Sequence, residues 1–436
     1  MGRGVVDQVA TMTGLRVRAL ADLDVERAVR AFTENGWERA QVTVTDREGE
    51  AQDALRRGSA VATADPLLVP KLPLEAVSEC TGDPETGARV AMEAIANGRH
   101  VVMLNVEADV VVGPILAEKA RQAGVVYTLA AGDQPGAIFE MCDWATTLGF
   151  RIVCAGRGTV LFPNDHHATP ETYQEIALRN RMNPKMYNEF RDGTKSQLEM
   201  VAVSNVLQMP PARRGMHEPH CSWQDLGKVF SLQVEGGILE AEGVVDMANA
   251  VDASGNYVHE DKVFPGVFVV VTSEHPGVRS AMGSLFEPGF GGTAQQWGPN
   301  WGLFRPYHLA CVEVPMSMAR AIFSQKPTGD LRGGMVAELV AAAKKDLTPG
   351  DELDGGGGYT VYGLSEKSDV ARRENLVPFG FAYHGRVTRP VARDQALSWD
   401  DVEVDRSGFL YRLRAEQDRL FSPVAGQPAS GLTEGG

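Results

Sequence analysis

The sequence predicts an α/β protein built from two or three domains. Residues 1–150 alternate short apolar runs, typical of buried strands, with amphipathic helical patterns, and this alternation is typical of a doubly wound parallel sheet. Residues 151–328 mix helices with longer apolar runs, which predicts an α+β substrate domain, and residues 329–422 form a third, β-patterned module. A length of 436 residues exceeds that of one ordinary domain. The tail, 423–436, is rich in Gly, Ala and Pro and is expected to be disordered.

Composition and charge exclude several classes of protein. Hydrophobic residues at 43% and charged residues at 23% are typical of a globular protein. The net charge of −15 disfavours nucleic acid or a membrane surface as partner, although local lysines and arginines can still bind a small anion. The five cysteines are odd in number and lack C-x-x-C spacing, which indicates reduced thiols rather than disulfides or a zinc site. No membrane-spanning run or signal-peptide pattern is present, so we expect a cytoplasmic protein.

The N-terminal region carries part of a dinucleotide-binding pattern. A helical run follows Gly4, and the strand predicted over 15–21 ends at Asp22, 18 residues after that glycine. In a Rossmann-like fold an acidic residue at the end of the second strand accepts hydrogen bonds from the adenosine ribose, so Asp22 is assigned to cofactor binding. Gly2 would be the third glycine of the G-x-G-x-x-G loop, and the first strand and first two glycines are missing. We expect the native start to lie upstream of Met1; the alternative is a chain that does not hold a pyrophosphate.

The next elements continue the β-α alternation. We expect strands at 40–45, 74–80, 101–104 and 125–129, and helices at 25–35, 84–96 and 112–123. Ligands of such sheets bind beyond the carboxyl ends of the strands. We therefore assign Thr81, Gly82, Asn105 and Glu107 to the cofactor and Asp133 to the substrate.

The segment 183–199 is the predicted centre of the chemistry. A helix is expected to begin at Asp192, whose side chain can cap free backbone N–H groups. Lys195 then lies in the first turn, where the helix dipole disfavours a cation. A lysine placed there needs a carboxylate, a phosphate or a proton to give away. The alternative is a surface lysine whose ammonium lies in solvent.

Further cationic residues predict anion binding. Arg157 stands between two glycines at the end of a strand over 151–158, where backbone and guanidinium can meet an anion together. Arg305, Tyr307 and His308 precede an apolar run that we expect to be a helix, and Lys185 with Arg305 and His308 would suit a phosphate. The runs 232–245 and 263–271 are expected to be antiparallel strands of a sheet covering the site.

A set of side chains that could bind a metal ion consists of Glu140, Asp143, His166, His167, His217 and His220. The H-x-x-H pair at 217–220 has no second pair at ligand spacing, and neighbouring prolines indicate a loop, so a dedicated zinc site is not expected. A magnesium or manganese ion held by carboxylates and substrate oxygens is an open alternative.

Two stretches carry a resemblance to a known superfamily. Residues 100–108 (HVVMLNVEA) and 127–135 (YTLAAGDQP) resemble the homoserine dehydrogenase superfamily, and residues 192–199 (DGTKSQLE) resemble its branch with a C-terminal SAF domain. That branch includes the deoxyxylulose-phosphate reductoisomerase-like (DRL) enzymes. Homoserine dehydrogenases read Asn-Lys-Ala where this chain reads Asn105-Val-Glu-Ala108, which speaks against plain homoserine oxidation.

The resemblance implies roles for the central segment and the C-terminal module. Lys195 would give or take the hydroxyl proton during hydride transfer, Asp192 would orient it, and Lys185 is the competing candidate. Residues 329–422 would form a SAF-like β-clip, and a weak repeat at an offset of 44 residues, 345–353 against 389–397, agrees with it. Four glycines at 355–358 lack a following Lys-Ser/Thr, so a tight β corner is expected rather than a phosphate loop.

Together these features predict an NAD(P)-dependent oxidoreductase. Its substrate would be a small phosphorylated polyol or keto sugar, as in DRL enzymes that convert deoxyxylulose 5-phosphate to methylerythritol 4-phosphate for isoprenoid biosynthesis. Asp22 disfavours the 2′-phosphate of NADP, and the choice between NAD and NADP is open. Two alternatives are a homoserine-dehydrogenase-type semialdehyde oxidoreductase and a non-catalytic scaffold or sensor with an eroded nucleotide loop. We also expect a homo-oligomer.

Overall fold

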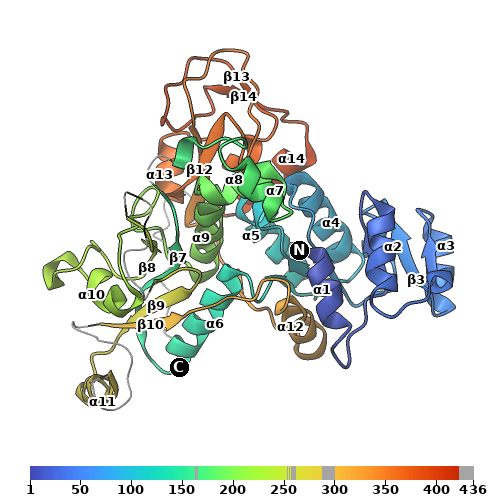
Figure 1. Cartoon of the computed structure of the whole chain (residues 1–436), viewed down its shortest axis with the longest axis horizontal. Helices are drawn as coiled ribbons and strands as arrows, with labels where there is room; N and C mark the ends of the chain where they lie inside the picture. The colour runs from blue at the N-terminus through green and yellow to red at the C-terminus, as the bar shows by residue number, and fades with distance from the viewer. Residues whose placement is uncertain (163–164, 253, 255, 257–261, 287–299, 422–436) are drawn as a thin grey trace.

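The computed structural model describes residues 1–162, 165–252, 254, 256, 262–286 and 300–421, so the predicted tail lies outside the described residues. Figure 1 shows three lobes, and the helix α9 (Thr194–Leu207) lies between two of them. Residues 19–63 form the lobe at the right of the view, away from α9. Residues 244–249, 267–272 and 301–305 contribute to the second lobe, and residues 337–403 contribute to the third. Within the described residues, every helix is too short or too polar to span a lipid bilayer.

Two parallel three-stranded sheets form the first half of the chain. The first contains, in order, β1 (Ala19–Ala21), β3 (Ala60–Thr63) and β2 (Val42–Val44). The second contains β4 (Ala76–Glu79), β5 (His100–Met103) and β6 (Tyr127–Leu129). Parallel pairing confirms the predicted α/β class, but the expected single sheet is absent. β1 and β4 are edge strands of separate sheets, and no strand of the described residues pairs with both.

The helices of this half are α1 (Gly2–Val9), α2 (Val25–Thr33), α3 (Glu48–Arg56), α4 (Pro84–Ala96), α5 (Val106–Gln122) and α6 (Gln134–Thr147). α5 begins at Val106, six residues before the predicted start, because the Asn105 side chain caps it by accepting a 3.0 Å hydrogen bond from the Ala108 N–H. β3 and α3 were not predicted, since the strand sequence Ala-Val-Ala-Thr is too short and too poor in large apolar residues to stand out.

A four-stranded sheet with both parallel and antiparallel pairs follows in the middle of the chain. Its strands are, in order, β10 (Trp301–Arg305), β9 (Val267–Thr272), β7 (Arg151–Thr159) and β8 (Val244–Asn249). β8 is parallel to β7 and β9 is antiparallel to it, so β8 and β9 run antiparallel to each other with β7 between them. The strand expected over 263–271 is confirmed as β9, but of the run 232–245 only Val244 and Val245 belong to a strand. Gly236, at φ 87°, and the hydrogen bond from the Gly237 N–H to the Leu232 carbonyl close a turn where the strand was expected.

The remaining helices surround this sheet and the C-terminal lobe. They are α7 (Gln174–Arg179), α8 (Pro184–Arg191), α10 (Leu226–Val229), α11 (Pro276–Phe286), α12 (Val314–Ala319), α13 (Ser368–Arg373) and α14 (Phe409–Phe421). α9 is buried along most of its length and packs against α5, α6, β7, β8, β11 and β12. Its position places the site between the second and third lobes, against α5 and α6.

The C-terminal lobe is built from two antiparallel pairs. β11 (Ala337–Ala343) pairs with β12 (Val361–Lys367), and β13 (Arg386–Val387) pairs with β14 (Val402–Glu403). The two copies of the weak repeat lie side by side, because Leu347 and Val391, 44 residues apart, exchange backbone hydrogen bonds of 2.8 and 3.0 Å. Gly355 and Gly357 adopt φ 69° and 67°, which agrees with the predicted tight turn.

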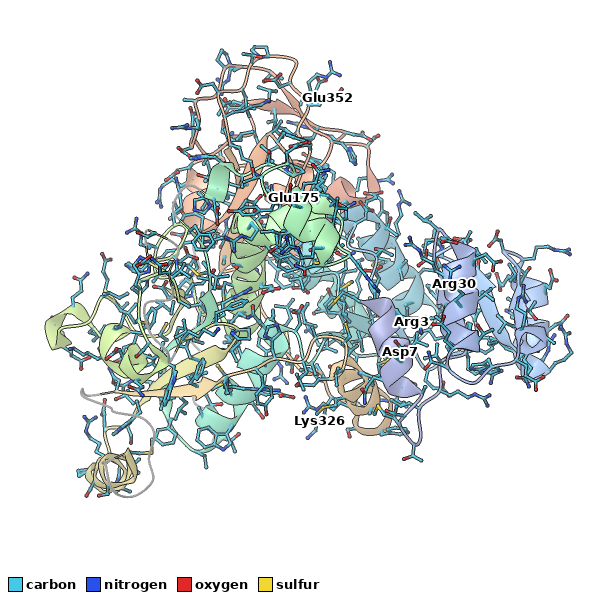
Figure 2. All side chains as sticks on the ribbon, in the orientation of Figure 1. Arg3, Asp7, Arg30, Glu175, Lys326 and Glu352 are labelled. Atoms are coloured by element: carbon cyan, nitrogen blue, oxygen red, sulfur yellow. The ribbon has the colours of Figure 1, made fainter. Side chains whose placement is uncertain are left out.

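Exposed ion pairs link side chains on the surface of the protein, among them residues of the N-terminal helices. Figure 2 labels Arg3 and Asp7 on α1, whose side chains form a 2.7 Å ion pair, and Asp7 also accepts a hydrogen bond from Asn35 after α2. Glu352, labelled on the C-terminal lobe in the same figure, pairs with Arg386 at 2.8 Å. Such solvent-exposed pairs contribute little stability, about 0–1 kcal/mol each.

Candidate active site

Lys195 and Glu107 meet where the N-termini of α9 and α5 face each other. The Lys195 Nζ donates a 2.7 Å hydrogen bond to the Glu107 Oε1, and the two side chains are only 16% and 9% exposed. The position of Lys195 in the first turn is as predicted, and its partner is a carboxylate. The alternative of a solvated surface lysine is therefore wrong. Glu107 is itself favoured in the first turn of α5, because the N-terminal end of the helix dipole attracts an anion.

The surrounding carboxylates keep Lys195 charged. Burial alone would lower the pKa of Lys195, but four acidic side chains raise it well above its ordinary value: Glu107, Glu199, Asp133 and Glu189. Lys195 is thus held as an ammonium. It can stabilise negative charge on a bound substrate, and it holds its own proton tightly.

The Asp192 carboxylate binds Lys344 rather than Lys195. Its fully buried carboxylate accepts a 2.7 Å hydrogen bond from the Lys344 Nζ and a 2.9 Å bond from the Thr194 N–H. The helix begins at Thr194 rather than at Asp192, with Gly193 as N-cap at φ 86°. The expected contact is missing because the ammonium of Lys344, brought by the C-terminal lobe, already occupies the carboxylate. Burial raises the pKa of Asp192, and Lys344 opposes this rise.

A second buried ion pair lies one turn further along α9. Glu199 pairs with Arg157 of β7, and both side chains are buried. Arg157 was predicted to bind an anion, and in the structure that anion is the carboxylate of Glu199 in the same chain. Burial raises the pKa of Glu199 to about 7, against the opposing effect of Arg157. Glu199, four residues after Lys195, is thus a carboxyl group that titrates near neutral pH.

Glu189 of α8 is a further site residue, which the sequence analysis missed. Burial, followed by the charge of Glu107, raises the pKa of Glu189 to about 8. Its Oε1 atom is buried and has no hydrogen-bond partner in the described part of the chain. Glu189 follows Lys185 by four residues and so shares a face of α8 with it, a signal that the sequence offered.

The side chain of Lys185 points toward the C-terminal lobe and not toward Lys195. Asn183 caps α8 by accepting hydrogen bonds from the backbone N–H groups of Lys185 at 2.9 Å and Met186 at 3.3 Å. The Lys185 Nζ donates to the backbone carbonyl of Asp354, and its side chain is exposed. Geometry therefore favours Lys195 over Lys185 as the central cation.

The expected strand-end residues gather at the carboxyl ends of β4 and β5. The Asn105 Nδ2 donates to the Thr81 Oγ1 at 3.2 Å and to the Asp83 carbonyl at 2.9 Å. The Thr81 N–H donates to the Glu79 Oε1 at 2.9 Å, and Gly82 follows at φ 75°. Glu79 is only 2% exposed, and its Oε2 has no partner among the residues described here. A buried acceptor without a donor fits a bound ligand that carries hydroxyl or amide groups.

Asp22 lies apart from this group, whereas Gly2 lies beside Cys80, the residue between Glu79 and Thr81. Asp22 ends β1 in the other sheet and accepts a 2.8 Å hydrogen bond from the Asp24 N–H. A Cβ added at Gly2 would lie 3.6 Å from the Cys80 Cβ, an ordinary contact, whereas one at Gly4 would lie 2.8 Å from the Cys311 Cβ. The glycine that close helix packing requires is therefore Gly4, and the role expected of Gly2 is not seen.

The predicted phosphate-binding residues are already paired. Arg305 forms ion pairs with Glu140 at 3.1 Å and Glu313 at 2.6 Å, and its guanidinium lies 4.9 Å from the centre of the Tyr307 ring. His308 donates from Nδ1 to the Pro265 carbonyl at 2.9 Å, and burial lowers its pKa.

The helix expected directly after His308 begins only at Val314. Pro315, in the first turn of that helix, has no N–H to give to a helical turn upstream of it. Asp133, assigned to the substrate, caps α6 by accepting a 3.1 Å hydrogen bond from the Gln134 N–H, and its carboxylate contributes to the charge around Lys195.

The side chains of metal-binding type are spread over separate contacts. His166 donates from Nδ1 to the Asp192 carbonyl at 2.7 Å, His167 contacts Asp394 at 2.7 Å, and His217 contacts Asp246 at 2.6 Å. Glu140 pairs with two arginines, and Asp143 and His220 are exposed. Among the described residues, no group of three or more His, Cys, Asp or Glu side chains is arranged to hold a metal ion.

The comparison with protein families supports an enzyme of the oxidoreductase class. Residues 132–314 match the family described as "Oxidoreductase DRL, catalytic domain". The matched segment contains Asp133, Arg157, Lys195 and Glu199, whereas Glu107 precedes it. No curated protein sequence matches the chain significantly.

Three solved structures of oxidoreductases are similar to the chain at low identity. 1-Deoxy-D-xylulose 5-phosphate reductoisomerase from Zymomonas mobilis in complex with NADPH is 18% identical (TM-score 0.32; 48% of this chain and 56% of that chain). A DOX-P reductoisomerase with NADPH, fosmidomycin and magnesium is 14% identical (TM-score 0.30; 47% and 54%). A "probable dehydrogenase" from Thermotoga maritima is 11% identical (TM-score 0.36; 75% and 86%). The chain spans little more than half the length of the two reductoisomerases.

Proposed function

We propose that this enzyme is a nicotinamide-dependent oxidoreductase of the DRL type, which interconverts a hydroxyl and a carbonyl group on a small phosphorylated keto sugar or polyol. The observation that carries the proposal is the buried ammonium of Lys195, paired with Glu107. The match of residues 132–314 to the DRL catalytic domain supports the reaction class.

The chemistry of carbonyl reduction suits this arrangement. A bound nicotinamide would supply or accept the hydride, and negative charge then develops on the substrate oxygen. An ammonium held in place before the reaction stabilises that charge without reorganisation. Because the neighbouring carboxylates raise the pKa of Lys195, the proton is better supplied by a carboxyl group that titrates near neutral pH. Glu199 at about 7 and Glu189 at about 8 fit that role.

The strand-end group fits the cofactor side of the proposal. Thr81, Asn105 and the unpaired oxygen of Glu79 offer hydrogen-bonding groups at the carboxyl ends of neighbouring parallel strands, where such folds bind nucleotides. Asp22 has no contact with them, so the preference between NADH and NADPH is left to measurement.

The phosphate group of a substrate would have to displace carboxylates that now pair with the arginines of the site. Arg157 and Arg305 are paired with Glu199, Glu140 and Glu313, so a phosphate would replace at least one of these carboxylates. Comparison of a keto sugar with its phosphate ester therefore measures how much the phosphate contributes. We further propose that residues 329–422 are a SAF-like module, which the pairing of its two repeat copies supports.

The test is nicotinamide oxidation by the purified full-length protein. NADH and NADPH are each combined with deoxyxylulose 5-phosphate, with deoxyxylulose and with aspartate semialdehyde, with and without magnesium or manganese, and products are identified by NMR. We expect turnover with deoxyxylulose 5-phosphate and a rearranged, methyl-branched triol phosphate as product. An unrearranged alcohol would move the assignment to simple carbonyl reduction, and turnover with aspartate semialdehyde alone would favour the homoserine-type reaction. No turnover and no binding of either cofactor would contradict the proposal.

A further inference from the structure

We propose that Lys344 of the C-terminal lobe is a positioning residue for the site, which holds the turn between α8 and α9 and thereby fixes the direction of Lys195. This inference rests on the proposed function for its kinetic consequences. Lys344 directly follows β11, is 3% exposed and lies 149 residues after Lys195 in the sequence. Neither the sequence pattern nor the family match, which ends at residue 314, includes it.

The Lys344 ammonium joins three separate segments. Its Nζ donates to the Asp192 Oδ2 at 2.7 Å, to the Ala168 carbonyl at 2.9 Å and to the Gly358 carbonyl at 2.8 Å. An ammonium has three N–H donors, so the hydrogen-bonding capacity of Lys344 is fully used. The group therefore determines the relative positions of the 165–168 turn, the α8–α9 turn and the glycine-rich turn at 355–358.

Asp192 transmits this position to the first turn of α9. Its Oδ1 accepts the Thr194 N–H at 2.9 Å, and its backbone carbonyl accepts the His166 Nδ1–H at 2.7 Å. Gly193 takes φ 86°, a conformation that favours glycine, so the turn leads directly into the helix. Lys195 is the next residue after Thr194, and a shift of the turn would move its ammonium relative to Glu107.

Strand β12 holds the same helical turn from a second side. The Gly363 N–H donates to the Thr194 Oγ1 at 2.9 Å, and the Ser365 N–H donates to the Gln197 Oε1 at 3.0 Å. The C-terminal lobe thus contacts α9 on both sides of Lys195 in the sequence. This lobe is therefore part of the scaffold of the site.

The chemistry of the Lys344–Asp192 pair also favours positioning over stability. Removing two charges from water costs free energy, and a buried ion pair is often no more stabilising than apolar residues of the same volume. What such a pair supplies is a defined geometry, because its hydrogen bonds have direction whereas apolar contacts have little. A pair retained beside the proposed catalytic lysine fits that use.

The test separates positioning from folding by means of a double variant. Lys344→Met alone leaves the Asp192 charge buried without a partner, and we expect a clearly lower Tm. In Lys344→Met/Asp192→Asn no unpaired charge remains, and the amide oxygen can still accept the Thr194 N–H, so Tm should rise above that of Lys344→Met. It should stay below the wild-type value, because the carbonyls of Ala168 and Gly358 have lost the donor that Lys344 supplies. Lys345→Met changes the exposed neighbouring lysine and is the matched control.

Kinetics are measured at a temperature at which every variant is folded by circular dichroism. We expect the double variant to lose about 10- to 100-fold in kcat, because a misplacement of about 1 Å at a reacting group has an effect of that size, while KM changes by less than about threefold. Lys345→Met should match the wild type. A folded double variant with wild-type kcat would overturn the inference, whatever its Tm.

A second readout does not depend on activity. Amide hydrogen exchange of residues 192–199 should be faster in the double variant than in the wild type and in Lys345→Met, since the turn has lost its charged anchor. If the wild type proves inactive with every nicotinamide and substrate pair, the proposed function fails while this exchange measurement still tests the anchor. Unchanged exchange in 192–199 would overturn the positioning role.

Discussion

Lys195 and Glu107, 88 residues apart in the sequence, form a 2.7 Å ion pair at the point where the first turns of α9 and α5 meet. A cation in the first turn of a helix is disfavoured by the helix dipole, and an anion there is favoured. The ion pair with Glu107 therefore stabilises the Lys195 ammonium at a position that the dipole of its own helix disfavours. The result is a buried ammonium surrounded by carboxyl groups, as the proposed carbonyl chemistry requires.

The first prediction concerns the stability of this pair. We expect Glu107→Gln to lower the free energy of unfolding by about 3 kcal/mol, because the Lys195 ammonium stays buried without its charged partner. Urea unfolding followed by circular dichroism measures the change. The control Glu118→Gln removes an exposed ion pair with Arg121 on the same helix and should cost less than about 1 kcal/mol. Equal losses in the two variants would mean that the Lys195–Glu107 pair does not behave as a buried one.

A second prediction follows from the carboxyl group of Glu189. Burial and the charge of Glu107 raise its pKa from 4.5 to about 8, so between these values the folded chain keeps a proton that the unfolded chain releases. The contribution of Glu189 to stability should therefore fall as pH rises from about 5 to about 8. Glu189→Gln removes the titrating group, and its Tm should fall less steeply over that window than the Tm of the wild type.

Thermal unfolding at half-unit pH steps measures the difference for Glu189. Glu175→Gln on α7, an exposed position labelled in Figure 2, is the control and should follow the wild-type curve. Other buried carboxyl groups contribute slopes of the same sign, so only the difference between wild type and variant is informative. Parallel Tm curves for Glu189→Gln and the wild type would refute the prediction.

The third prediction concerns Asn105, which caps α5 and contacts Thr81. Asn105→Ala should lower the free energy of unfolding by about 1 kcal/mol or more, the usual effect of losing an N-cap. It should also raise the KM for the nicotinamide cofactor more than it lowers kcat, because the strand-end group is disrupted while Lys195 keeps its partner. Asn97→Ala, at the exposed end of α4, is the control for both measurements. If the KM for the cofactor is unchanged in Asn105→Ala, the ends of β4 and β5 are not part of the cofactor site.

Several features of the site were predictable because they depend on neighbours in the sequence. Helix propensity and spacing placed Lys195 in a first turn and showed that it needed a partner. The strand end at Asn105 was predicted to face a ligand, and it carries the cap of α5. The turn formed by the four glycines was likewise predicted from the residues themselves.

The pairings themselves were not predictable, because they join segments far apart in the sequence. Glu107 meets Lys195 only because the first turns of two helices are brought together, and Asp192 meets Lys344 across 152 residues. Arg157 does meet an anion, but the anion is Glu199 of the neighbouring helix. The separation of the parallel strands into two sheets likewise depends on strand pairing, which no local pattern encodes.

The most direct test of the central claim compares two lysines of the same segment. Lys195→Met and Lys185→Met are assayed for nicotinamide oxidation under identical conditions, after circular dichroism has shown that both variants are folded. We predict that Lys195→Met loses roughly 100- to 1000-fold in kcat/KM, the usual effect of removing a group that stabilises developing negative charge. Lys185→Met should stay within about threefold of the wild type, since its ammonium contacts the Asp354 carbonyl. A folded Lys195→Met variant with near wild-type turnover would contradict the central role of the buried ammonium.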